Sequence, residues 1–76
     1  MPYYLCIGSD DLEKSERCST VREAVLIYRE VADELGRYDQ RIHASLHKAL
    51  KRSEITEYPD YLLSVGPRGG IRCERV

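Results

Sequence analysis

Two histidines, His43 and His47, stand four residues apart and could bind a metal ion or titrate near neutral pH. A spacing of four places both side chains on one face of a helix or a strand. A zinc site needs a third and usually a fourth ligand, and Ala44 stands where the zinc-protease helix motif has glutamate. We therefore expect neither a metal ion nor a cofactor.

The turn at residues 66–70, Gly-Pro-Arg-Gly-Gly, superficially resembles a phosphate-binding loop. It lacks the Gly-Lys-Ser/Thr ending and a following helix, so we interpret it as a hairpin turn with Arg68 at its tip. No strand–turn–helix elbow and no ordered Ser-His-Asp triad is recognisable, and 76 residues leave little room for a deep pocket. The protein is therefore predicted not to be an enzyme.

Three cysteines, Cys6, Cys18 and Cys73, contain no close pair. An odd number would leave one unpaired in an oxidising compartment, so reduced thiols in a cytoplasmic protein are the simpler interpretation. Cys18, beside Arg17, comes closest to the electropositive setting of a nucleophile.

The composition, 42% hydrophobic and 33% charged, is typical of one globular domain over residues 1–76. No apolar run approaches the roughly 18 residues that cross a bilayer, so we expect no membrane contact.

Positive charge gathers between residues 37 and 52, where five basic residues stand against Asp39. If this segment adjoins the turn near residue 68, the two could bind a nucleic-acid backbone. Nucleic-acid binding is thus an alternative function, and its predicted residues are Arg37, Arg41, Lys48, Lys51, Arg52 and Arg68. Acidic residues at 9–16 and 53–60 argue against an extended basic surface.

Negative charge gathers in residues 9–16, where four acids stand against one base. We expect a polar loop from Ser9 to Arg17, which is either simply solvated or an acidic finger for a basic partner protein. The acids that would make this finger are Asp10, Asp11, Glu13 and Glu16.

One amphipathic helix from Thr20 to Leu35 must position these segments. Its apolar residues recur at i, i+3, i+4 and i+7, as on one buried helical face. Thr20 and Glu23 have the spacing of a capping box, and Gly36 is suited to end the helix. Leu26 points away from the apolar face, so it is either an isolated surface residue or a partner contact.

The remaining elements are short strands. Alternation predicts strands over residues 2–7, 61–65 and 71–76, the last two joined as a hairpin with Ile71 and Cys73 facing inward. Residues 41–48 fit a strand and a helix about equally well, and we favour the strand. The predicted fold is α+β in two layers, one helix on a mainly antiparallel βαβββ sheet, with βααββ as the alternative.

A single helix covers only one face of such a sheet. Tyr4, Cys6 and Leu62 would then point to the uncovered face, which suggests a partner protein or a homodimer. The predicted partner-binding residues are Asp10, Asp11, Glu13, Glu16, Tyr4 and Leu26.

Two stretches, Ser-Thr-Val-Arg-Glu-Ala-Val at 19–25 and Tyr-Pro-Asp-Tyr-Leu-Leu-Ser-Val-Gly-Pro-Arg-Gly-Gly at 58–70, resemble short accessory proteins of phages and mobile elements, a set that includes anti-CRISPR proteins. The resemblance covers less than a third of the chain. It implies a small non-catalytic inhibitor or adaptor that covers a host protein's surface. Our prediction is therefore a protein-interaction module, with no functional residue carried over from the resemblance.

Overall fold

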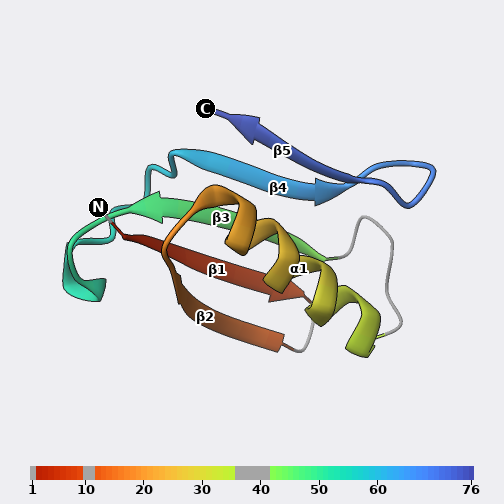
Figure 1. Ribbon diagram of the computed structural model, residues 1–76, viewed down its shortest axis with the longest axis horizontal. Coiled ribbons are helices and arrows are strands. Elements are labelled where there is room, and N and C mark those ends of the chain that lie inside the picture. The colour runs from red at the N-terminus through yellow and green to blue at the C-terminus, as the bar shows by residue number, and fades with distance from the viewer. Residues whose placement is uncertain (1, 10–11, 36–41) are drawn as a thin grey trace.

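One helix packs on one face of an antiparallel sheet in the computed structural model, which describes residues 2–9, 12–35 and 42–76 (Figure 1). Along the described chain the elements are β1 (Tyr3–Ser9), β2 (Leu12–Cys18), α1 (Val21–Leu35), β3 (His43–Lys48), the short 3-10 helix η1 (Arg52–Glu54), β4 (Tyr61–Val65) and β5 (Ile71–Arg75). The strand order across the sheet is β2-β1-β3-β4-β5. The predicted two-layer α+β fold is confirmed, with one strand more than the predicted βαβββ order.

The additional strand is β2, so the prediction of a polar loop from Ser9 to Arg17 was wrong. β2 pairs antiparallel with β1 over its whole length, from Ser9 opposite Leu12 to Tyr3 opposite Cys18. An edge strand tolerates charged side chains on both faces, because such charges also discourage pairing with other chains. This is why a strand in this position can carry a loop-like composition.

The helix α1 begins as the sequence predicts, at a cap formed by Thr20. The Glu23 backbone N–H donates to Thr20 Oγ1 at 3.1 Å, which satisfies one of the free amides of the first turn. The Glu23 carboxylate accepts from the backbone N–H of Ser19 at 3.0 Å rather than from that of Thr20. The predicted helix end at Gly36 lies outside the described residues.

The core lies between α1 and the central strands. Leu5 of β1, Leu46 of β3 and Leu63 of β4 are at most 1% exposed and face the helix. Tyr28 of α1 is fully buried beside them, and its hydroxyl donates to the Ile42 carbonyl oxygen at 2.7 Å. This bond ties the helix to Ile42, the residue directly before β3.

The ambiguous segment forms a central strand. β3 pairs with both β1 and β4, so residues 43–48 are not helical and the βααββ alternative was wrong.

Asp60 joins three strands at one end of the sheet. Its carboxylate accepts from the Lys48 N–H at 2.7 Å, its N–H donates to the Leu46 carbonyl at 2.9 Å, and its carbonyl accepts from the Val76 N–H at 3.0 Å.

The C-terminal hairpin is confirmed. Gly69 has φ of 80°, which a residue with a side chain rarely adopts, and its N–H donates to the Gly66 carbonyl at 3.0 Å. The Gly66 N–H donates to the Gly70 carbonyl at 2.7 Å and starts the ladder between β4 and β5. Ile71 and Cys73 lie on the helix side as predicted. Cys73 is nevertheless exposed, because α1 does not cover β5, the edge strand, at that position.

Candidate interaction surface

The sheet face opposite α1, called the open face below, gathers most of the side chains that could act on another molecule. The strand registers place on it side chains from all five strands, since alternate residues of a strand point to the same face. These are Tyr4, Cys6, Glu13, Ser15, Arg17, His43, Ser45, His47, Leu62, Ser64, Arg72 and Glu74.

One end of the open face is covered by the connection between β3 and β4. The guanidinium of Arg52, the first residue of η1, lies over the Tyr4 ring at 5.8 Å from its centroid, as in a cation–π contact. Tyr4 and the neighbouring His47 are each only 7% exposed. Tyr4, predicted to contact a partner, is therefore mostly covered by the protein's own chain.

The rest of the open face contains a hollow of about 660 Å³. Its lining includes Cys6 and Gly8 of β1, His43 and Ser45 of β3, and Leu62 of β4. Gly8 gives the hollow part of its shape, because a Cβ there would lie 3.1 Å from Cε1 of His43. No sequence pattern predicted this hollow, although a glycine inside a strand is a known sign of close approach to the backbone.

A hydrogen-bonded pair lies on β3 at the border of the hollow, with 2.8 Å between Ser45 Oγ and His47 Nε2. This is the distance expected of a serine nucleophile and its base. A catalytic triad also requires a group that orients the imidazole through Nδ1, and Nδ1 of His47 is buried with no partner among the described residues. The bond itself holds the Ser45 and His47 side chains in fixed rotamers on β3.

Metal ligands do not converge on the two histidines in the described part of the chain. Nowhere in residues 2–9, 12–35 and 42–76 do three or more His, Cys, Asp or Glu side chains form a group that could hold a metal ion. His43 is exposed on the hollow while His47 is buried, so the pair does not present two equivalent ligands.

Cys18 does not have the setting of a nucleophile. It is 1% exposed beneath α1, and its Sγ–H points to the Glu16 carbonyl at 3.9 Å. Burial, together with the carboxylates of Glu23 and Glu16, raises the pKa of the Cys18 thiol to about 11. Cys6 lines the hollow and Cys73 is exposed on β5, where partial burial still raises the pKa of its thiol.

The two described acids of the predicted finger, Glu13 and Glu16, lie on opposite faces of the sheet. Asp10 and Asp11 lie outside the described residues, and β2 directs Glu13 to the open face and Glu16 to the helix side. Glu16 lies 3.6 Å from Lys14 Nζ in a half-exposed ion pair, and both line a groove against Glu30 and Glu34 of α1. Of the two described acids, only Glu13 borders the hollow.

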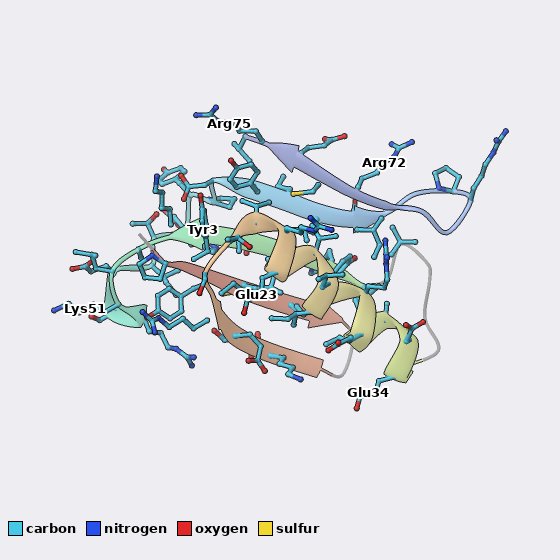
Figure 2. All side chains as sticks on the ribbon, viewed as in Figure 1. Tyr3, Glu23, Glu34, Lys51, Arg72 and Arg75 are labelled. Carbon is cyan, nitrogen blue, oxygen red and sulfur yellow. The ribbon has the colours of Figure 1, made fainter. Side chains whose placement is uncertain are left out.

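The four described basic residues, Lys48, Lys51, Arg52 and Arg68, do not form one patch. Lys48, Lys51 and Arg52 lie at the end of the sheet where β3 leads into β4, and Figure 2 shows Lys51 there. Arg68 lies in the turn between β4 and β5, at the opposite end of β4. Arg37 and Arg41 are outside the described residues.

Leu26, predicted to contact a partner, is 50% exposed on α1, on the other side of the molecule from the open face.

Comparisons with protein-family models, with curated protein sequences and with solved structures found no match to this chain. Among the described residues, α1 is too short and too polar to cross a membrane.

Proposed function

We propose that this protein is a small non-catalytic protein-binding module, and that its partner docks on the open face at the hollow and Leu62. The observation that carries the proposal is the hollow of about 660 Å³ on a face that α1 leaves bare, with Leu62 48% exposed beside it. Concave sites that accept an anchor side chain are where binding energy concentrates in protein interfaces.

The charges around the hollow favour a protein as the occupant. Glu13 and Arg52 both contribute to its lining, so opposite charges border the same site. A polyanion such as DNA or RNA gains its affinity from a surface of uniform positive charge. A protein surface with an apolar anchor and polar groups of both signs matches this rim better. The resemblance to phage and mobile-element accessory proteins supports an inhibitor or adaptor that covers a bacterial protein.

The test compares two leucines of similar exposure on opposite faces. Leu62 is 48% and Leu26 is 50% exposed, so Leu62→Arg and Leu26→Arg introduce the same charge at matched positions. Tagged wild type and both variants would be used to capture partners from a nuclease-treated bacterial lysate, with quantitative mass spectrometry. We expect Leu62→Arg to lower recovery of the partner at least about tenfold, because it places an unpaired charge in the interface, and Leu26→Arg to retain it.

Other outcomes would redirect or reject the proposal. Loss of the partner only in Leu26→Arg would move the site to the helix and overturn the choice of the open face. In a parallel capture without nuclease, retention of nucleic acid alone, lost when nuclease is added and weakened steeply by salt, would support the alternative function of the basic residues. A second copy of the chain as the sole captured protein would replace the partner with a homodimer.

A further inference from the structure

The outer edge of β5 carries backbone groups that pair with no strand in the described chain, because β5 is the last strand in the sheet order. The Gly66 N–H bonds to Gly70 at one end of the hairpin, and the Val76 N–H bonds to Asp60 at the other. Hydrogen-bonded pairs alternate along an antiparallel ladder, so residues 72 and 74 direct their N–H and C=O groups toward β4. Ile71, Cys73 and Arg75 direct theirs outward.

We propose that two copies of this protein pair through their β5 edges, antiparallel and centred on Cys73. In this register Cys73 faces Cys73 of the second copy, and Ile71 faces Arg75 of the second copy. These are the three residues with outward backbone groups, so every such group on β5 finds a partner and six new backbone hydrogen bonds form. A two-fold axis perpendicular to the sheet makes the interface isologous and closed.

The side chains agree with this register. Arg72 and Glu74 point to the open face, and centring on Cys73 places Arg72 of each copy opposite Glu74 of the other. Directly opposed charges of opposite sign stabilise a strand pair, whereas like charges destabilise it. Figure 2 shows Arg72 and Arg75 along β5, at the margin of the sheet. On the helix side, Cys73 faces Cys73 of the second copy, and Arg75 lies between Tyr61 of its own copy and Ile71 of the other.

The other sheet edge is less suited to pairing of two copies. β2 could also be paired with itself, but the groove beside it is lined by Glu16, Glu30 and Glu34 against Lys14 alone. A two-fold axis at β2 would bring two such grooves together on the same side of the sheet. Repulsion between their carboxylates opposes that arrangement, which leaves β5 as the edge where charge favours a second copy.

Charge reversal tests the register directly. Analytical ultracentrifugation of the purified full chain over a concentration series should show a monomer–dimer equilibrium. Glu74→Arg alone and Arg72→Glu alone should each weaken dimerisation about tenfold or more, because both opposed pairs become like-charged. The double variant Arg72→Glu with Glu74→Arg should restore it, since the pairs are re-formed with signs exchanged. On β4 these residues face Ser64 and Leu62, and Arg72 also lies against Gly66. None of these neighbours is charged, so the folded monomer is expected to tolerate the changes.

Cys73 supplies an independent measurement. Opposed residues of a hydrogen-bonded pair have Cα atoms about 5.5 Å apart, so a short bismaleimide should link the two Cys73 thiols. Linked dimer is expected in Cys6→Ser, where Cys73 is the exposed thiol, and not in Cys73→Ser.

A monomer at all concentrations would overturn the proposal, as would a dimer that ignores both single reversals or is not restored by the double variant. Glu13→Arg on β2 is the matched control and should leave the dimer intact. Loss of the dimer in this variant would mean that the two copies pair through β2 and not through β5. All these measurements use the purified protein without a partner. Their failure is therefore separate from failure of the proposed protein binding.

Discussion

At the residue scale, the bond from Tyr28 to Ile42 is the most consequential contact that no sequence pattern indicated. The phenol is fully buried, and its oxygen lies 2.7 Å from a carbonyl 14 residues away. Tyr28→Phe should lower the free energy of unfolding by about 1–3 kcal/mol, since it leaves a buried acceptor without its donor. Urea denaturation of the two proteins at pH 7 measures the difference.

The same residue predicts a pH dependence. Burial raises the pKa of Tyr28 from 10.0 to about 12, so folding favours the neutral phenol. The stabilisation of the folded state that comes from this raised pKa is complete below pH 10, the pKa of tyrosine in the unfolded chain. It is lost as pH rises toward 12. The stability difference between wild type and Tyr28→Phe should therefore shrink between pH 10 and 12. A constant difference over that range would contradict this account.

Cys18 should be the least reactive thiol of the three. Its pKa of about 11 leaves little thiolate at pH 8, and α1 shields the sulfur from reagent. We expect a variant that retains only Cys18 to react with a disulfide reagent at least about tenfold more slowly than a variant that retains only Cys73. The two rates should converge in denaturant, and unequal rates there would show that something other than burial is responsible.

At the element scale, the helix cap is the feature that the sequence predicted in most detail. Thr20→Ala should destabilise the protein by about 1 kcal/mol, because the N–H of Glu23 loses its acceptor. Thr20→Ser, which keeps a hydroxyl at the same position, should cost far less. Thermal unfolding followed by circular dichroism measures both, and equal losses would mean that the methyl group rather than the hydroxyl matters.

Local signals explain why some elements were predicted and β2 was not. The cap at Thr20 and the glycines of the C-terminal turn act within four or five residues, so both are readable from sequence. β2 has no comparable signal, because Glu13, Lys14, Glu16 and Arg17 break the alternation that marks a half-buried strand. Its pairing with β1 comes from tertiary context, and so does the choice of strand over helix in residues 43–48.

The candidate site was harder to predict than the helix and the strands, because it depends more on contacts between residues far apart in the sequence. Arg52 reaches Tyr4 across the sheet, and the hollow needs Gly8 and His43 on neighbouring strands, so neither could be derived from spacing. The positions of the described basic residues could not be derived from spacing either. Antiparallel topology sends Arg68 to the opposite end of β4 from the connection that holds Lys51 and Arg52.

At the scale of the whole molecule, a 76-residue domain has a small margin of stability, roughly 4–11 kcal/mol at the usual value per residue. Leu46, 0% exposed on the central strand, should carry a large share of it. Leu46→Ala is expected to cost about 2–5 kcal/mol and to lower the Tm by at least about 10 °C. Leu62→Ala, on the open face, should cost only about 1 kcal/mol because about half of that side chain already meets water.

The contrast between Leu46 and Leu62 shows how the binding test can be interpreted. If Leu62 contributes little to stability, the fold does not depend on it, and loss of a partner in Leu62→Arg can be attributed to the interface. A Leu62→Ala variant as unstable as Leu46→Ala would mean that the open face is part of the core of the fold. The binding test would then need a substitution at Glu13, which borders the same hollow from an exposed position on β2.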